Sequence, residues 1–339
     1  RMQILRKKNW WASEFKTAAK YNHLLKRLHL ENNRRVVLTT PMCSNTHCFK
    51  TLPSYEDRIL DNTLYLNSTV DPFDWKKSDI ERIIQEIERF QPINIDADPI
   101  YLVIFLNFLK EYGLDFNFSS IEFITLCYEF CPRNCLDYIK DFFQCQVLYI
   151  YGATETGHLY SRIDNGLYTL FPYDLAISFK CINSKNNLYE IFITSFKNEY
   201  MPLINYQIGD VVKIYHHDVD KTDGKESEVR LSRICGRTSA ITYDSLSQVI
   251  TLDDLDEIVA FFDKNIFLYQ ILFDENRVVF KYVTLNGQAL SEKLKLSFEN
   301  ALNDLYKEKL SFIFEHLPAL SPSGSGKFQL VQSGRLYEI

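Results

Sequence analysis

The chain has 339 residues, of which 46% are hydrophobic and 24% are charged, and its formal net charge at pH 7 is −6. This composition is typical of a soluble globular protein. The acidic balance argues against non-specific nucleic-acid binding, which needs clustered positive charge, and no apolar run reaches the length of a membrane span. Eight cysteines without the spacing of a small disulfide-rich domain indicate a reducing compartment, so we expect a cytoplasmic protein.

The first half of the chain alternates between helical and strand-like patterns. Apolar residues recur at helical spacing over residues 9–31, which predicts one long amphipathic helix. The elements expected after it are a strand at 35–41, helices at 80–90 and 99–112, a strand at 121–127, a helix at 132–143 and a strand at 147–150. This alternation predicts an α/β fold with a mostly parallel sheet that helices cover.

Short β-type runs replace this alternation after residue 165. Those at 167–171, 175–180, 189–194 and 211–215 predict an antiparallel β subdomain. Further runs at 267–273 and 277–283, a helix at 291–305 and a strand near Phe312 predict a compact C-terminal α+β lid. We expect a large domain of residues 1–238 and a small mobile domain of residues 239–339, with the boundary at Arg237–Tyr243.

The stretch Tyr-Ile-Tyr-Gly-Ala-Thr-Glu-Thr-Gly at 149–157 carries the most informative pattern. We expect an apolar strand to end at Gly152, which places the next side chains at the C-terminal edge of the sheet, where open α/β sheets bind ligands. Thr154 can bond a phosphate oxygen, and Glu155 can hold Mg²⁺ through oxygen. Tyr151 offers a flat face for an adenine ring.

Tyr-Gly-Ala-Thr-Glu resembles the Tyr-Gly-x-Thr-Glu signature of the adenylate-forming, acyl-CoA synthetase-like superfamily. Three further pieces follow in the order of that family: Pro-Leu-Ile-Asn-Tyr-Gln-Ile-Gly-Asp at 202–210, Cys-Gly-Arg at 235–237 and Ser-Gly-Ser-Gly-Lys at 323–327. The pieces are most similar to the phenylacetate–CoA ligase and capsule-biosynthesis ligase branch. They are spaced over the chain from about residue 35 to its end.

The resemblance implies an ATP-dependent carboxylic-acid ligase. Such an enzyme uses ATP and Mg²⁺ to make an acyl-adenylate from a small carboxylic acid. It then passes the acyl group to a thiol, either of CoA or of the phosphopantetheine of an acyl carrier protein. The resemblance gives catalytic roles to Lys327, Glu155 and Thr154, with Glu155 as the Mg²⁺ ligand. It implies that the nucleotide is bound by Tyr151, Gly152, Ala153, Thr154, Asp210 and Arg237.

Two of these roles have a physical reason. A bidentate carboxylate such as Asp210 can accept both ribose hydroxyls. Lys327 lies in a Gly/Ser-rich loop that lets it move in and out, and there it would neutralise the charge that develops on the carboxylate and the α-phosphate.

The expected acid pocket contains Tyr128, Glu129 and His158. Tyr128 stands where the family usually has Gly, and so bulky a side chain would narrow the pocket. Glu129 either lines the pocket or caps the helix that follows it, and capping is the simpler expectation. His158 has two open interpretations, a residue at the pocket mouth or a hydrogen-bonded structural histidine.

Several residues depart from the family pattern. No Ser/Thr/Gly-rich phosphate loop is found, and the segment from Arg1 looks like the one that follows that loop. We therefore expect either a shortened form or residues missing before Arg1. Ser239 replaces the usual hinge Asp, and Asn205 replaces the usual Arg. These changes keep a second function open, a degenerate homologue that binds an adenylate-like ligand or a protein partner without turnover.

Two groups of residues raise the possibility of a zinc site: Cys43, His47 and Cys48, and Cys127, Cys131, Cys135 and Cys145. Neither group contains the Cys-x2-Cys pair of structural zinc sites. We favour thiols packed in the core over zinc.

Overall fold

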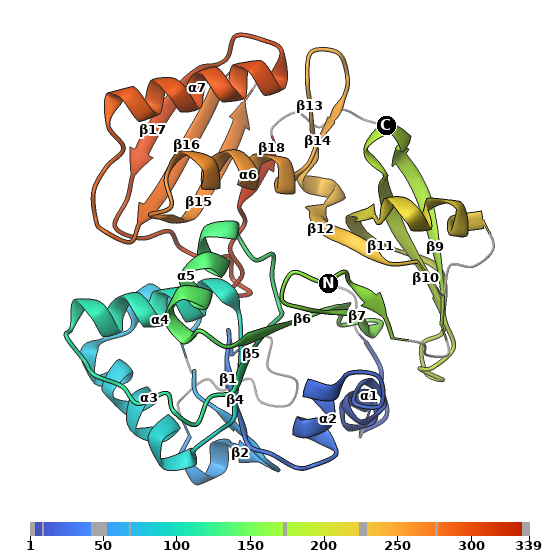
Figure 1. Ribbon diagram of the computed structural model, residues 1–339, viewed down its shortest axis with the longest axis vertical. Coiled ribbons are helices and arrows are strands. Elements are labelled where there is room, and N and C mark those ends of the chain that lie inside the picture. Colours follow the sequence, from blue (N-terminus) through green and yellow to red (C-terminus); the bar gives the residue numbers. More distant parts are fainter. Residues whose placement is uncertain are drawn as a thin grey trace.

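The computed structural model describes residues 4–8, 10–41, 53–67, 69–171, 175–223, 229–274 and 277–333. Its largest sheet has eight strands in the order β2-β3-β1-β4-β5-β6-β7-β8 (Figure 1). These strands are β1 Arg35–Leu38, β2 Ile59–Leu60, β3 Thr63–Tyr65, β4 Asn94–Ala97, β5 Phe123–Leu126, β6 Gln146–Ala153, β7 Gly157–Ile163 and β8 Thr169–Leu170. From β3 to β6 neighbouring strands are parallel, so the predicted α/β class is confirmed.

Helices cover both faces of this sheet. On one face lie α3 (Lys77–Phe90), α4 (Pro99–Glu111) and α5 (Arg133–Phe143), and on the other lie α1 (Trp10–Ala18) and α2 (His23–His29) (Figure 1). The strands explain this arrangement, because successive side chains of a strand point to opposite faces of the sheet. In β5, Ile124 and Leu126 belong to the core beneath α3–α5, whereas Phe123 packs with the residues of α2.

The single long helix expected over residues 9–31 is wrong. Helix α1 ends at Ala18, and α2 begins after Asn22. Asn22 has extended backbone, and its side-chain oxygen accepts from the N–H groups of Leu24 and Leu25 at 3.0 and 3.2 Å. A side chain that satisfies two free N–H groups starts a new helix, which apolar periodicity alone does not reveal.

The antiparallel β subdomain is present as expected. Its strand order is β12-β11-β10-β9, with all neighbours antiparallel. The strands are β9 Leu175–Asn183, β10 Leu188–Ser195, β11 Leu203–Ile214 and β12 Leu231–Arg237. Short 3₁₀ turns occur at Glu56–Arg58, Pro72–Asp74, Ser184–Asn186, His216–Asp223 and Thr238–Ala240.

The C-terminal unit begins beyond β12 with a small hairpin, β13 (Thr242–Tyr243) and β14 (Val249–Ile250). Its main sheet has the order β17-β16-β15-β18. The elements of the unit are α6 Leu252–Phe262, β15 Ile266–Asp274, β16 Arg277–Thr284, α7 Glu292–Tyr306, β17 Ser311–His316 and β18 Val331–Ser333. Phe298 of α7 packs on Phe280 of β16, so the helix closes one face of this sheet.

Three consecutive residues at the start of α5 join the large sheet layer to the C-terminal unit, and we call these contacts the α5 seam. Arg133 pairs with Asp253 and Asp256 of α6, each at 2.9 Å. The Asn134 amide donates to the carbonyls of Asp263 and Ile266, and the Cys135 thiol donates to the Phe267 carbonyl at 3.0 Å.

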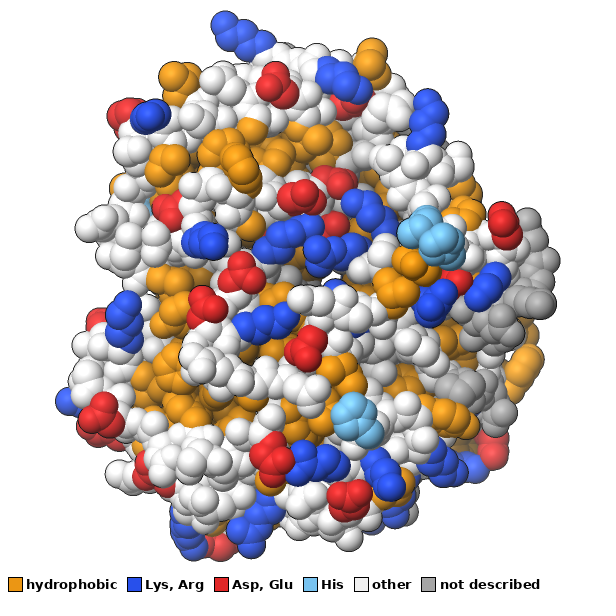
Figure 2. Space-filling model, viewed as in Figure 1, with side chains coloured by type: hydrophobic (Ala, Val, Ile, Leu, Met, Phe, Trp, Pro, Cys, Tyr) orange, Lys and Arg blue, Asp and Glu red, His pale blue; other side chains and the backbone are white. Residues whose placement is uncertain are grey.

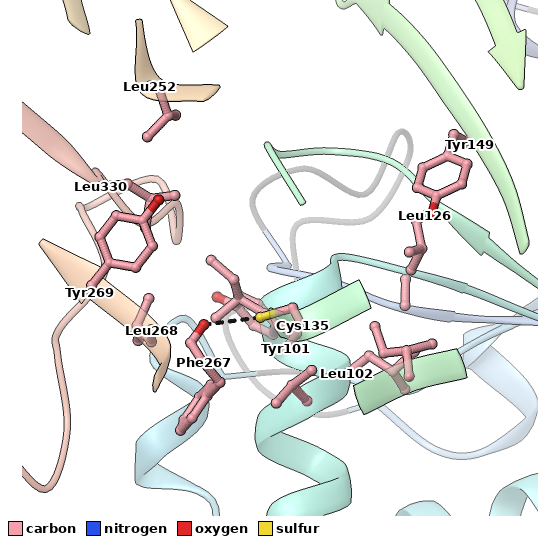
Figure 3. Packing of buried hydrophobic residues seen from close by; sticks show 14 of the residues in the cluster. Tyr101, Leu102, Leu126, Cys135, Tyr149, Leu252, Phe267, Leu268, Tyr269 and Leu330 are labelled. Atoms are coloured by element: carbon pink, nitrogen blue, oxygen red, sulfur yellow. Dashed lines mark hydrogen bonds between the residues drawn. The ribbon is translucent and has the colours of Figure 1, made fainter. Parts of the chain in front are cut away.

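Figure 3 shows the apolar core continuing across the α5 seam. Tyr101 of α4 and Cys135 of α5 lie beside Phe267 and Leu268 of β15. On the face shown in Figure 2, acidic and basic side chains lie together near the boundary between the two layers. The seam therefore combines a dry apolar contact with ion pairs.

None of the helices within these described ranges is long and apolar enough to cross a membrane.

Candidate functional site

The expectation that the strand ends at Gly152 is wrong, because β6 continues to Ala153 and pairs with β7 as a tight hairpin. The structure explains the glycines of the motif through this hairpin. A Cβ on Gly152 would lie 2.1 Å from the Gly157 carbonyl oxygen. Gly157 has a φ of 77°, and a Cβ there would meet the Glu14 carboxylate at 2.3 Å. Both positions need Gly because two chain segments approach each other closely.

Tyr151, Asp210 and Arg237 form one contact set, which we call the strand-end corner. The Tyr151 hydroxyl donates to Asp210 Oδ2, and Arg237 Nε forms an ion pair with Asp210 Oδ1, both at 2.9 Å. Asp210 of β11 faces Arg237 of β12 in the strand register, so the sheet itself builds the pair. Asp210 is 8% exposed, whereas the Arg237 side chain is 61% exposed.

The charges around Asp210 connect this corner to more distant residues. Burial raises the pKa of Asp210, and the negative charge of Glu155 raises it further. Arg237, the Tyr151 hydroxyl and Lys327 lower this pKa. Glu155 and Lys327 therefore lie close enough to act on the Asp210 carboxylate. The structure brings together residues from β6, from the β6–β7 turn, from β11 and β12 and from the C-terminal loop.

The β6–β7 turn carries Thr154 and Glu155 at the surface. The Arg6 guanidinium donates to the Thr154 carbonyl, and the Tyr206 hydroxyl donates to Glu155 Oε1 at 3.3 Å. No group of three or more His, Cys, Asp or Glu side chains within the described residues forms a metal site. A single carboxylate is nevertheless enough for Mg²⁺, which takes one or two protein carboxylates and completes its shell with phosphates and water. Glu155 fits this requirement.

The C-terminal loop Ser325–Phe328 is seated on the large sheet layer. Thr40 Oγ1 donates to the Ser325 carbonyl at 3.2 Å, and the Tyr101 hydroxyl donates to the Gly326 carbonyl at 3.0 Å. We call the groups that hold this loop the loop seat: the side chains of Thr40, Tyr101 and Glu129 and the backbone carbonyl of Tyr128.

The rest of the loop seat holds the next two residues. Lys327 Nζ donates to the Tyr128 carbonyl at 2.7 Å, and the Phe328 N–H donates to both oxygens of Glu129, at 3.2 and 3.1 Å. The Phe328 ring makes edge contacts with Phe73 and Tyr101. The expectation that Glu129 caps the following helix is wrong, because the N-cap of α5 is Pro132, without a side-chain hydrogen bond.

Asp98 lies beneath the loop seat. It is fully buried, and its Oδ1 caps α4 by accepting from the N–H groups of Ile100 and Tyr101. Its Oδ2 has no hydrogen-bond partner among the described residues. Burial raises the pKa of Asp98 to about 7, and Lys327 lowers it. Burial and Asp98 also raise the pKa of Glu129, which Lys327 lowers. This part of the site therefore favours a cation in the seated loop.

Tyr128 has a φ of 79°, a conformation that costs a bulky residue energy and that suits Gly. The Tyr128 side chain lowers the pKa of the Asp96 carboxylate, which pairs with Arg35 at 2.9 Å. The structure thus explains why Gly is usual here in the family that the motifs resemble. In this chain a tyrosine fills the space that a glycine would leave open.

His158 lies on β7, and its ring packs against aromatic rings of α1. Its ring centroid lies 4.9 Å from that of Phe15 and 5.6 Å from that of Trp11. Burial lowers its pKa to about 3, so the ring is neutral at physiological pH. His158 is thus a half-buried residue packed among aromatic rings.

The described cysteines are free thiols. The Cys127 thiol donates to Asp96 Oδ1 at 3.2 Å, and burial raises its pKa well above its usual value. Cys43, His47 and Cys48 lie outside the described residues.

Sequence reasoning missed the side chains that hold the C-terminal loop from below. Thr40, Tyr101 and Asp98 belong to no motif, and they meet the loop only through tertiary contacts and largely through its backbone. A possible signal is the Asp98-Pro99 pair, which is typical of a helix start, yet it would have predicted only the N-cap of α4.

No family model matches the chain. Protein CapK of Staphylococcus aureus is 19% identical over 249 residues, which cover 72% of this chain and 53% of CapK. The chain thus spans about half the length of this curated relative.

Among solved structures, 2-hydroxyisobutyryl-CoA ligase in its postadenylation state superimposes with a TM-score of 0.66 at 11% identity, covering 97% of this chain and 71% of the ligase. The same ligase in its thioesterification state, with CoA, gives 0.52 at 10% identity over 97% of this chain and 70% of the ligase. An anthranilate CoA ligase with bound anthranoyl-AMP gives 0.66 at 13% identity, over 96% of this chain and 62% of that one. The chain therefore has the fold of the adenylate-forming CoA ligases, as its spaced motifs predict.

Proposed function

We propose that this chain carries the adenylating and lid parts of an ATP-dependent acid–thiol ligase. The reaction joins a small carboxylic acid to AMP, releases pyrophosphate, and then transfers the acyl group to CoA or to a carrier-protein thiol. The observation that carries this proposal is the position of Lys327, which lies on the seated loop and acts electrostatically on Asp210 of the strand-end corner.

The strand-end corner would hold the nucleoside. Asp210 Oδ2 accepts one internal hydrogen bond and Oδ1 is paired with Arg237. Each oxygen has capacity for a further donor, so together they can accept two ribose hydroxyls. Arg237 is largely exposed and can reach a ribose or phosphate oxygen while it stays bonded to Asp210. Tyr151, Gly152 and Ala153 would form the wall beside the adenine.

The β6–β7 turn would hold the phosphates. The Thr154 hydroxyl is a donor for a phosphate oxygen, and Glu155 would hold Mg²⁺ together with the phosphates of ATP. When bound, this cation offsets the negative charge of the triphosphate. The protein residues themselves bind and orient the nucleotide.

Lys327 would provide the cation at the reacting carboxylate and α-phosphate. Such a charge counts for several kcal/mol only in a site that excludes water. The better superposition on the postadenylation state than on the thioesterification state supports an orientation suited to the first half-reaction. We propose that the C-terminal unit turns about residues 237–243 between the two half-reactions.

The acid would lie near Tyr128, which contributes bulk where the family has Gly. The filled position favours a short or narrow carboxylic acid. Glu129 belongs to the loop seat, so we place it at the edge of this pocket.

ATP–pyrophosphate exchange, screened over short hydroxy acids, aromatic acids and fatty acids on the full-length protein, tests the proposal. We expect exchange with at least one short acid, and loss of exchange in Lys327→Ala. Absence of exchange with every acid, in a protein that is folded and binds AMP, would contradict the proposal.

That last outcome would support a second candidate, a homologue that binds an adenylate without turnover. Asn205 and Ser239, in place of the family's usual Arg and hinge Asp, favour it. AMP binding by calorimetry separates the two functions, because both require it and only the ligase also shows exchange.

A further inference from the structure

The C-terminal loop is held in the loop seat mainly by bonds to its main chain. Three loop groups are bonded through the main chain, namely the carbonyls of Ser325 and Gly326 and the N–H of Phe328, and among these hydrogen bonds only that of Lys327 uses a loop side chain. A lysine side chain is flexible, and holding its backbone on both sides reduces the positions that its ammonium group can reach.

Gly326 makes this fit possible. Its φ is 80°, and a Cβ there would lie 2.0 Å from Thr40 Oγ1 and 2.4 Å from Thr40 Cβ. These atoms belong to a short β-branched side chain, so no rotation of a long chain could relieve the clash. The seat therefore accepts only a glycine directly before the lysine.

We propose that Thr40, Tyr101 and Glu129 are positioning residues that set Lys327 for adenylation, and that Gly326 is the loop residue that lets them engage. This inference rests on the proposed function for its kinetic consequence, although the seating of the loop is a structural claim in its own right. The three residues act on the reaction through Lys327.

The buried acids beneath the seat make it selective for a cation. Asp98 and Glu129 both face Lys327, and the loop brings the positive charge that their ionised forms need. An unseated loop would leave two buried carboxyl groups close together without that charge, which is unfavourable unless one binds a proton. The seat thus recognises both the backbone of the loop and the charge that it carries.

The chain offers a matched control two residues away. Gly324 lies in the same loop, and a Cβ on it would meet no atom within 4 Å. Gly326→Ala and Gly324→Ala therefore make the same chemical change, and both stiffen the loop, but only the first obstructs the seat.

Amide hydrogen exchange of the Phe328 N–H is the direct measurement, because this group is bonded to Glu129 in the seat. We expect faster exchange in Gly326→Ala and in Glu129→Ala, with wild-type exchange in Gly324→Ala. Adding Thr40→Gly to Gly326→Ala removes both clashing atoms and should restore part of the protection. Equal exchange at Phe328 in wild type, Gly326→Ala and Gly324→Ala would overturn the inference.

Single-turnover kinetics then test whether the seat sets Lys327 for adenylation. In Gly326→Ala we expect adenylate formation to slow on the order of a hundredfold, with unchanged affinity for ATP. Thioester formation from synthetic acyl-adenylate should stay near the wild-type rate. Glu129→Gln keeps an acceptor for Phe328, and it should retain more of the adenylation rate than Glu129→Ala.

The proposed function and the role of the seat can be disproved independently of each other. If wild type forms no adenylate but the exchange contrast is present, the proposed function is wrong and the seat stands. If wild type forms adenylate and Gly326→Ala does so at the same rate, the positioning role is wrong.

Discussion

The strand-end corner and the loop seat achieve precision by different means. The corner joins the side chains of Tyr151, Asp210 and Arg237, which belong to strands of two sheets that contain no strand of the C-terminal unit. The seat holds a loop that comes from another layer, and it grips the main chain of that loop. The corner is thus built in advance, whereas the seat exists only while the two layers are in this orientation. The contrast predicts that binding and chemistry can be separated by mutation.

Lys327→Ala should have the largest effect, and it should act on rate alone. Loss of the cation should slow adenylate formation by about a hundredfold or more, since electrostatic groups at a developing charge contribute on that scale. Affinity for ATP should change little, because the corner is intact. Paired single-turnover assays of adenylate formation and of thioester formation measure this. An equal loss of rate in both half-reactions would contradict a role of Lys327 in adenylation alone.

Asp210→Ala should show the reverse pattern. It would remove the two charge-assisted hydrogen bonds that we propose Asp210 makes to the ribose, together about 3 kcal/mol, so nucleotide affinity should fall on the order of a hundredfold. The rate at saturating ATP should fall much less. Calorimetry with AMP checks the affinity, and unchanged binding in a folded variant would exclude Asp210 as the ribose anchor.

Arg133→Ala tests whether the seat depends on the α5 seam. It leaves Asp253 and Asp256, both nearly fully buried, without this partner, which should destabilise the C-terminal contact by about 2 kcal/mol. Adenylation and the protection of the Phe328 amide should decrease together, while AMP affinity stays unchanged. Arg89→Ala breaks an exposed pair with Glu56 and serves as the control. Loss of AMP affinity in Arg133→Ala would contradict the independence of the corner.

Asp98→Asn should change the stability of the fold, by an amount that depends on pH. The folded pKa of Asp98, about 7, lies above the ordinary 3.8, so the folded state holds its proton more tightly than the unfolded chain does. Wild-type stability should therefore fall as pH rises from 4 to 7, and Asn, which keeps the helix cap, does not titrate.

The variant should gain on the order of 4 kcal/mol of stability relative to wild type between pH 4 and pH 8. Urea unfolding at four pH values measures the gain, with the exposed Asp115→Asn as control. A constant difference across this range would show that Asp98 does not titrate in the folded protein.

The sequence predicts the parts of the fold in which local pattern and tertiary structure agree. Helices α3, α4 and α5 have clear apolar periodicity, and they form close to the expected bounds. Strand β4, Asn-Ile-Asp-Ala, was missed because two of its four residues are polar. Its polar side chains find their partners only through tertiary structure, since the Asn94 amide donates to Thr125 and the Asp96 carboxylate accepts from Arg35 and Cys127.

Candidate site residues divide in the same way. Asp210, Arg237 and Lys327 stand in short motifs; the first two pair at the strand-end corner, and Lys327 lies in the loop seat. The seat could not be predicted, because its contacts are between the backbone of one segment and single side chains distant in sequence. Tyr128 was expected to narrow a pocket, but its left-handed backbone conformation follows only from the three-dimensional structure.

The β6–β7 hairpin changes what the Tyr-Gly-Ala-Thr-Glu-Thr-Gly stretch can be used to diagnose. Its two glycines are required by the approach of one strand to the other and of α1 to the turn, whatever ligand is present. A descendant that had lost every trace of turnover would still need them to fold. The glycines of this signature therefore mark the architecture of the hairpin, and by themselves they do not indicate activity.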